Sequence, residues 1–469
     1  MRGSWAVVAD RRVPGLERFT DPVRVGDLVV YHRGGADLPS TAPFEIDVRT
    51  LAVAAPAGDL PAEPEQRTVI RVAEDAVVAS TSVFNEEAVY AAEGPAGGFA
   101  YFTDLLLAAL VLPALGLEVR VSTGPVGADP EATLVPGVRR LRHSTRERRA
   151  RVDSGWRRAA EQSDDLLERF REPHRDDPLT AGKAQLSELD AVIGAIAAER
   201  PGTGYATLLS GGIDSGTVTY LAAARGLDVL PYSVGTPWGD EFADAQELCD
   251  EAGLEMRRVR LDEDAIVRAI PAAVRWLGTS TAEVVEVALT ATAVYQAGVL
   301  EPGRVLLTGY GSDLINAGLF TPFESPQELI EQGLESIRRT RTSGELSNRM
   351  PLAHGVEAFH PFWTLPVMRV ALETAPACKV RDGREKFHLR SAMAQHVPAG
   401  IAWRRKIAVH HGGGLQNGIR RRVAADLGGH DPERVYRACF AELLALAGRG
   451  RLDDWDAQEV YAAAVAASR

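Results

Sequence analysis

The chain has 469 residues, more than a single hydrophobic core usually supports, so its length predicts two or three domains. Its composition, 45% hydrophobic and 25% charged, is typical of a folded globular protein and excludes a disordered or fibrous chain. The formal net charge of −12 disfavours nucleic acid as a partner, because most of the surface would repel a phosphate backbone.

Two further absences bear on the compartment. Three distant cysteines show neither metal nor disulfide spacing, which favours a reducing environment: Cys249, Cys378 and Cys439. The N-terminus has no apolar signal region, and the long apolar run at 105–117 is shorter than the ~20 residues of a membrane span. We expect that run to form a buried helix followed by a turn. The sequence thus predicts a cytoplasmic protein with no membrane partner.

Residues 1 to about 140 alternate short β-type runs with turn residues, which predicts a strand-rich first domain. Charge dominates residues 142–182, where Pro173 and Pro178 interrupt the pattern, so we interpret this stretch as a connector with helical pieces. We interpret the basic run at 139–151 as a solvated linker face rather than a patch for RNA or an acidic partner, because no aromatic residues interleave with its arginines to stack bases.

The second half of the chain alternates strand and helix patterns. A helix is predicted at 183–199 and a strand at 205–209; further elements are predicted at 217–224, 228–234, 241–252, 256–261, 283–297 and 304–308. Such alternation predicts a parallel sheet with helices on both faces and ligands at the carboxyl ends of the strands. Residues 322–469 read as helical cover with one irregular segment at 410–418.

The string SGGIDS at 210–215 follows the predicted strand 205–209 and opens a helix. Backbone N–H groups and the helix N-terminus would face a single anion there, which predicts a phosphate-binding loop. The lysine and spacing of a Walker loop are missing. The full string resembles the pyrophosphate loop of the N-type ATP pyrophosphatases, which implies ATP binding by Ser210, Gly211, Gly212, Asp214 and Ser215.

A carboxylate inside a phosphate loop needs a cation beside it. Asp214 lies in the loop, and Asp313 follows another predicted strand. Carboxylates at neighbouring strand ends could share magnesium, which prefers oxygen ligands and often keeps phosphates in its shell. For Asp313 alone, a helix N-cap is the alternative.

Together with TGYGSD at 308–313, the loop looks like the synthetase domain of the asparagine synthetase family, and within it like the β-lactam synthetases. Matches cover essentially residues 180–425, with weaker ones in the first domain; they include 283–295, 360–363, 383–393, 404–414, 102–110, 133–141 and Trp156. The resemblance implies an α/β and α+β protein with domains 1–160 and 161–469. The first would be a glutaminase-like, Ntn-type β-rich sandwich, and the second a parallel-sheet PP-loop synthetase.

One departure concerns the source of nitrogen. Glutamine-hydrolysing members of the family need a cysteine directly after the initiator methionine, and Arg2 stands there in this chain. The first domain is therefore expected to be a structural remnant that releases no ammonia from glutamine.

The resemblance also assigns the chemistry of amide formation. It places Tyr310 and Glu345 where β-lactam-forming members keep a proton-accepting dyad, and Lys406 where a cation stabilises the reacting acyl group. The physical demand is plain, because an ammonium cannot attack an acyl-adenylate until a base removes its proton. Further ATP or pyrophosphate contacts are predicted at Gly311, Ser312 and Lys386. His410 and His411 lack a third ligand at metal spacing and are assigned to the loop.

These features predict an AMP-forming carbon–nitrogen ligase that uses ATP and Mg²⁺, adenylates a small amino or carboxylic acid, and closes an intramolecular amide in specialised metabolism. Val287 stands where a β-lactam synthetase has a pocket tyrosine, so we expect a reshaped substrate pocket around Val287 and Ala291. Alternatives are an intermolecular ligase using ammonia or an amine, a lasso-peptide macrolactam synthetase, transfer-RNA thiolation and a non-catalytic nucleotide sensor. A homodimer is left open.

Overall fold

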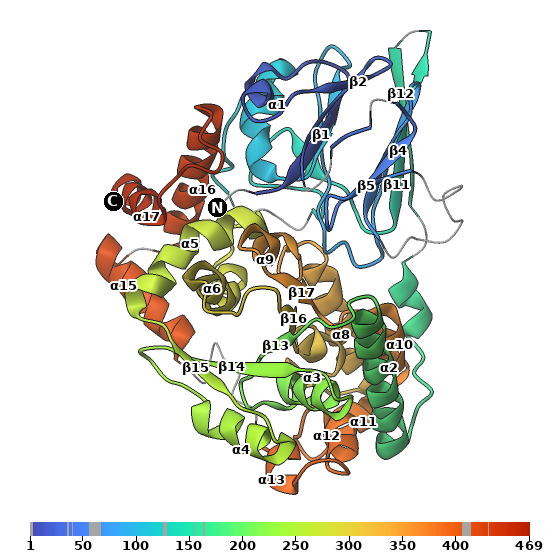
Figure 1. Ribbon diagram of the computed structural model, residues 1–469, viewed down its shortest axis with the longest axis vertical. Coiled ribbons are helices and arrows are strands. Elements are labelled where there is room, and N and C mark those ends of the chain that lie inside the picture. Colours follow the sequence, from blue (N-terminus) through green and yellow to red (C-terminus); the bar gives the residue numbers. More distant parts are fainter. Residues whose placement is uncertain are drawn as a thin grey trace.

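The computed structural model describes residues 3–34, 37–39, 41–55, 67–124, 129–153, 155–162, 165–405, 414–429 and 431–469. Arg2, Lys406, His410 and His411, which the sequence singled out, lie outside these ranges. Figure 1 shows antiparallel sheets from the first third of the chain above a parallel sheet that helices surround.

Two antiparallel sheets form the first region. The first has the order β10-β8-β9-β1-β3-β2, with β1 (Trp5–Ala9), β2 (Val23–Val25), β3 (Leu28–Arg33), β8 (Tyr90–Glu93), β9 (Phe99–Phe102) and β10 (Val138–Arg140). The second has the order β12-β11-β7-β6-β4-β5, with β4 (Phe44–Asp47), β5 (Val53–Ala54), β6 (Val69–Val72), β7 (Ala76–Ser80), β11 (Thr145–Val152) and β12 (Gly155–Gln162).

Alternating apolar side chains explain why these sheets pack face to face. In β1, Ala6 and Val8 point into a core shared with Ile46 and Ile70 of the second sheet. The intervening side chains of β1 belong to a second core that continues through η2 (Leu105–Leu107) and α1 (Ala108–Ala114). The predicted strand-rich region and the buried helix at 105–117 are therefore confirmed.

The prediction of a connector at 142–182 is wrong for its first half, where β11 and β12 form a hairpin. Its basic run is likewise no linker face. Arg139 donates to Glu147, 2.5 Å away, and Arg149 donates to Glu93. Because Glu147 is fully buried within the second sheet, these arginines balance the charge of its carboxylate and do not form a free basic patch.

The second region holds a five-stranded sheet in which every neighbouring pair is parallel. Its order is β15-β14-β13-β16-β17, with β13 (Tyr205–Leu208), β14 (Val229–Gly235), β15 (Arg257–Arg260), β16 (Val305–Leu307) and β17 (Glu357–Phe359). The sequence predicted the first four and missed β17, which is only three residues long.

Helices cover both faces of this sheet. On one face Tyr205, Val305 and Leu307 share a core with α2 (Pro178–Ala198), α3 (Ile213–Ala224) and α4 (Phe242–Ala252). On the other, Ala206 and Leu306 share a core with α5 (Glu263–Leu277) and α6 (Ala282–Ala297). The strongly amphipathic α5 is absent from the predicted elements.

The remaining helices are mostly C-terminal: η1 (Pro14–Arg18), η3 (Leu166–Phe170), α7 (Ser312–Ile315), α8 (Pro326–Thr340), α9 (Arg349–Ala353), α10 (Leu365–Glu373), α11 (Pro376–Lys379), α12 (Phe387–Met393), α13 (Ala399–Ala402), α15 (Leu415–Leu427), α16 (Pro432–Gly448) and α17 (Ala457–Ser468). The irregular segment predicted at 410–418 is wrong from Leu415 onward, where α15 begins. The three cysteines are buried and form no disulfide. In the described part of the chain, no helix combines the length and apolarity needed to cross a bilayer.

Candidate active site

The loop at 210–215 connects the end of β13 to the start of α3. Gly211 adopts φ +73°, and a Cβ there would lie 2.5 Å from Cβ of Asp244, so the position requires glycine. Ser215 Oγ accepts from the backbone N–H of Ser210 at 3.2 Å, and the two hydroxyls are also 3.2 Å apart. The loop is thus closed at the N-terminus of a twelve-residue helix, where the backbone N–H groups of the first turn can bind an anion.

The segment 308–313 follows β16 and lies against this loop. A Cβ on Gly309 would come within 2.6 Å of the backbone nitrogen of Ser215, so glycine allows the two loops to touch. Ser312 Oγ donates to Asp214 Oδ1 at 2.5 Å. Gly311 adopts φ +91° and caps α7. The two motifs found in the sequence therefore form one site at neighbouring strand ends.

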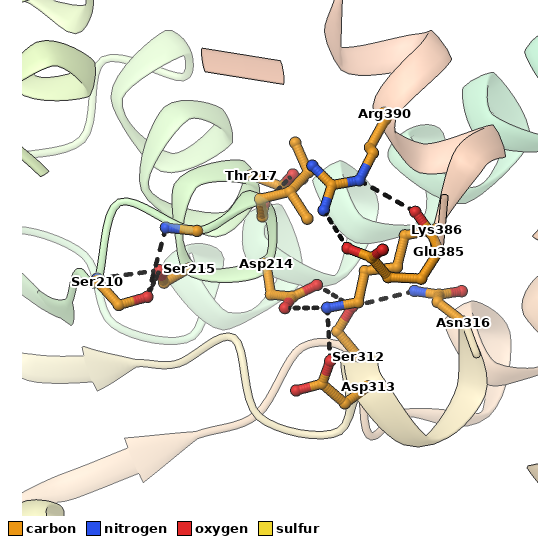
Figure 2. A network of polar contacts seen from close by, with 12 residues as sticks. Ser210, Asp214, Ser215, Thr217, Ser312, Asp313, Asn316, Glu385, Lys386 and Arg390 are labelled. Carbon is orange, nitrogen blue, oxygen red and sulfur yellow. Dashed lines mark hydrogen bonds and ion pairs between the residues drawn. The ribbon is translucent and has the colours of Figure 1, made fainter. Parts of the chain in front are cut away.

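Lys386 joins the two aspartates predicted to hold magnesium (Figure 2). Its Nζ is 2.5 Å from Asp313 Oδ1 and also bonds Asp214 Oδ2. Lys386 is fully buried, while the side chains of Asp214 and Asp313 retain 10% and 29% of their exposure. The sequence predicted Lys386 as a phosphate contact, but its bond to both carboxylates is new.

A buried amide and imidazole network supports this cluster. Asn316 donates to Ser312 Oγ at 3.1 Å and accepts from Gln185 at 2.9 Å. His388, two residues after Lys386, contacts the side chains of Gln185 and Asn316 at 3.1 and 3.2 Å. Burial lowers the pKa of His388 to about 3, so the ring is neutral. The sequence suggested no role for these three residues, although His388 lies within the matched stretch 383–393.

Arginines bind the C-terminal segment to the loop. Arg390 donates to the carbonyls of Ala402 and Arg404 at 3.0 and 2.8 Å, and to the side chain of Glu385. Arg404 in turn donates to the carbonyl of Gly211 at 3.2 Å. The chain is therefore anchored against the phosphate loop two residues before Lys406.

Whether this cluster fits Mg²⁺ can be judged from its donors. Asp214 and Asp313 already converge on one cationic atom, Nζ of Lys386, which shows that both can face a shared cation. Among the described residues no set of three or more His, Cys, Asp or Glu side chains is arranged around a metal position. The residues fit an ion that takes two carboxylates and completes its shell with phosphate oxygens and waters, as Mg²⁺ does.

Tyr310 stands at the edge of the same loop and packs against His360 in a tilted arrangement, with ring centroids 5.8 Å apart. The hydroxyl of Thr308 lies 2.6 Å from His360 Nδ1 and accepts from the backbone N–H of Tyr310 at 3.3 Å. Tyr310 keeps 36% of its surface exposed. Desolvation, with a smaller effect of the nearby Glu345 carboxylate, raises the pKa of Tyr310 to about 12.

Glu345 lies between α8 and α9 and is half-buried. Ser343 Oγ donates to its Oε1 at 2.9 Å. Desolvation raises the pKa of Glu345, partly offset by the Ser343 hydroxyl. Among the hydrogen bonds of the described residues, none joins Glu345 to Tyr310, so the structure brings the predicted dyad into electrostatic range without direct contact. The sequence suggested no role for Ser343. Its position two residues before Glu345 is nevertheless one from which a serine hydroxyl can reach the glutamate.

The N-terminal end of α6 lies near this glutamate. The Glu283 carboxylate contributes to the raised pKa of Glu345, so the start of α6 lies near it. Val287 is one turn further along the same face and is half-buried, whereas Ala291 is 3% exposed. These positions remain a prediction for the substrate pocket.

Comparison with known proteins agrees with the family resemblance seen in the sequence. The family model for asparagine synthase matches residues 197–337 and 327–466, which is more than half of the chain. Carboxyethyl-arginine beta-lactam-synthase from Streptomyces clavuligerus is 32% identical over 225 residues, covering 47% of this chain and 43% of that protein. Asparagine synthetase B [glutamine-hydrolyzing] from Escherichia coli (strain K12) is 25% identical over 225 residues, covering 43% and 40%. The chain thus covers less than half the length of these relatives.

Among solved structures, NMN synthetase from Francisella tularensis aligns with a TM-score of 0.22 and 18% identity, over 33% of this chain and 70% of that one. A likeness at that level bears on neither the fold nor the function.

Proposed function

The chain belongs to the asparagine synthase family, and from that premise we propose that it is an ATP-dependent amide synthetase that closes an intramolecular amide. The observation that carries the proposal is the site at the strand ends. It combines a phosphate-type loop and the carboxylates of Asp214 and Asp313 with an exposed tyrosine, Tyr310, and a half-buried glutamate, Glu345.

In the first step, a substrate carboxylate attacks the α-phosphate of ATP and pyrophosphate leaves. The backbone N–H groups at the start of α3 and the ammonium of Lys386 would bind the pyrophosphate oxygens. Asp214 and Asp313 would hold Mg²⁺, which offsets the negative charge of the phosphates when bound. Buried groups that are already fixed by hydrogen bonds need little reorganisation as that charge develops.

In the second step, an amine of the same molecule attacks the acyl-adenylate and AMP leaves. The amine must first lose a proton, and Tyr310 can accept it while passing its own to Glu345. The raised pKa of Tyr310 keeps the phenol protonated between transfers, which suits a relay, and Glu345 acts as the final base. Holding amine and acyl carbon in one molecule favours ring closure, since effective molarities reach ~10⁵–10⁸ M in well-oriented cases.

We assign stabilisation of the acyl oxygen to Lys406, supported by the anchoring of Arg404 to the loop two residues earlier. The substrate is proposed to be a small amino acid whose amine and carboxylate can meet in a ring, with Val287 and Ala291 shaping its pocket. The name of one relative, carboxyethyl-arginine beta-lactam-synthase, describes an activity of this type.

The proposal is tested by ATP–pyrophosphate exchange with a panel of β-amino acids, followed by mass spectrometry of the product. We expect exchange that depends on one class of acid, release of AMP, and a product with the mass of the substrate less one water. Release of ADP, or no exchange with any acid, would overturn it. A product that forms only when ammonia or another amine is added would favour the intermolecular ligase. A requirement for a precursor peptide would favour macrolactam synthesis.

A further inference from the structure

A chain of buried polar side chains ends on Asp214, whose side chain belongs to the phosphate loop. Its other four members are fully buried: Gln185, Ser312, Asn316 and His388. Gln185 lies on α2, His388 on α12, and Ser312 and Asn316 begin and cap α7, so the chain joins three helices to the loop. Figure 2 shows the part that passes from Asn316 through Ser312 to Asp214. The proposed reaction assigns no step to Gln185, Asn316 or His388.

The carboxylate at its end sets the direction of these hydrogen bonds. A carboxylate only accepts, so Ser312 Oγ, which is 2.5 Å from Asp214 Oδ1, donates its single hydrogen there. The same oxygen can then only accept from Asn316, whose Nδ2 lies 3.1 Å away. The amide nitrogen of Asn316 therefore faces Ser312, and its amide oxygen faces the other way.

Two donors hold that amide oxygen in place. Gln185 Nε2 donates to Asn316 Oδ1 at 2.9 Å, and His388 Nε2 lies 3.2 Å from the same atom. His388 Nε2 is also 3.1 Å from Gln185 Oε1, so this nitrogen faces two acceptors and carries the proton. All the hydrogen bonds thus run toward Asp214. Bonds aligned in this way polarise and strengthen one another in a low-dielectric interior.

Close packing of α2 on α12 brings the two outer donors together. A Cβ at Gly182 would lie 2.0 Å from the carbonyl oxygen of His388, so glycine is what allows this approach. Gln185 is three residues further along the same side of α2. Lys386, two residues before His388, bonds Asp214 Oδ2 directly. The α12 segment therefore acts on both oxygens of Asp214, on Oδ2 through Lys386 and on Oδ1 through the chain.

We propose that Asn316 is a positioning residue for adenylation and that His388 acts with it by fixing its amide group. Together they keep Ser312 donating to Asp214 Oδ1, so the carboxylate has one orientation before ATP binds. The kinetic consequence rests on the proposed function. A carboxylate fixed in advance need not reorganise as charge develops on the phosphates, and loss of such support typically costs about tenfold to a hundredfold in activity.

Asn316→Leu tests the role of the amide, because it keeps a similar size but can neither donate to Ser312 nor accept from the outer donors. In a crystal structure of the variant without ATP, we expect Ser312 Oγ to lie more than about 3.5 Å from Asp214 Oδ1. The maximal rate of ATP–pyrophosphate exchange should fall about tenfold or more. KM for the acid should stay within about twofold, because the acid does not touch the chain. Asn417→Leu, at an exposed position of α15, is the matched control and should change neither quantity.

Two variants of His388 separate positioning from packing. Both remove the ring, but only the side chain of His388→Gln can still donate to the amide oxygens. We expect the rate of exchange to fall about tenfold in His388→Leu and to stay within about threefold of wild type in His388→Gln. His396→Leu, at an exposed position after α12, is the control.

The inference is overturned if Ser312 stays bonded to Asp214 in Asn316→Leu, or if the two His388 variants lose the same rate. If the wild type shows no exchange, the proposed function fails, and the distance between Ser312 and Asp214 in Asn316→Leu still decides the inference.

Discussion

The two ends of the candidate site are built differently. At the end proposed to bind phosphate, here called the phosphate end, Asp214 and Asp313 both bond the fully buried Lys386. At the end proposed to receive the amine, here called the amine end, Tyr310 is 36% exposed and has no direct hydrogen bond to Glu345 among the described contacts. A fixed polar cluster suits a step that every carboxylate substrate shares. A more open pair leaves room for the particular amine, so specificity is expected at that end.

The largest effect should come from breaking the phosphate end. Asp214→Asn removes a charge that holds Lys386 and the proposed Mg²⁺, and we expect ATP–pyrophosphate exchange to fall about a thousandfold, or ~4 kcal/mol. Asp190→Asn, at an exposed ion pair with Arg225, is the control and should leave exchange unchanged. Exchange within about tenfold of wild type in the Asp214 variant would show that adenylation occurs elsewhere.

Breaking the amine end should separate the two steps. Glu345→Gln keeps the shape but removes the final base, so product formation should fall about a hundredfold or more. Exchange should stay within about twofold of wild type, because adenylation does not need the amine deprotonated.

Glu335→Gln, on an exposed glutamate of α8, serves as the matched control for that experiment. Parallel losses of exchange and product in the Glu345 variant would mean that the residue supports the whole site and is no specific base.

The same contrast explains what the sequence could predict. Asp214 and Asp313 follow parallel strands whose ends must meet, so the phosphate end was predictable from strand order. No local pattern distinguishes Glu345 from a surface glutamate, and only the family resemblance identified it. The bond of Lys386 to Asp214 joins residues that are 172 positions apart in the sequence, which no local pattern contains. The β11–β12 hairpin was missed because its arginines conceal an alternation that depends on the buried Glu147.

The strand-rich region holds the segment that follows Glu345, and a stability measurement can test this contact. Glu87 accepts from Ser347 Oγ at 2.7 Å and from the backbone N–H of Asn348 at 2.8 Å, just beyond Glu345. Burial raises the pKa of Glu87 from 4.5 to about 7. The unfolded chain therefore loses this proton first, and the folded state loses stability as pH rises from about 4.5 to about 7.

The glutamine of Glu87→Gln cannot ionise. As pH rises through this window, the free energy of unfolding of the variant should therefore increase relative to that of the wild type, by at most about 3 kcal/mol. Chemical denaturation at several pH values measures the difference. Glu199→Gln, a 74% exposed glutamate on the surface, should follow the wild type. A difference that does not change with pH would show that Glu87 is not the titrating group.

The smallest effect tests how Glu345 is tuned. Because the pKa of Glu345 is raised, product formation should fall as pH drops through that value, while exchange should not follow the same limb. Ser343 Oγ donates to the ionised carboxylate, so Ser343→Ala should raise this pKa further and move the limb to higher pH by less than about one unit, or ~1 kcal/mol. Ser336→Ala removes a hydroxyl that bonds only the carbonyl of Gln332 and should leave the limb in place. If the acidic limb of the pH–rate profile stays fixed or moves to lower pH in the Ser343 variant, another group limits the reaction. The exposure of Tyr310 would then serve substrate binding rather than proton transfer.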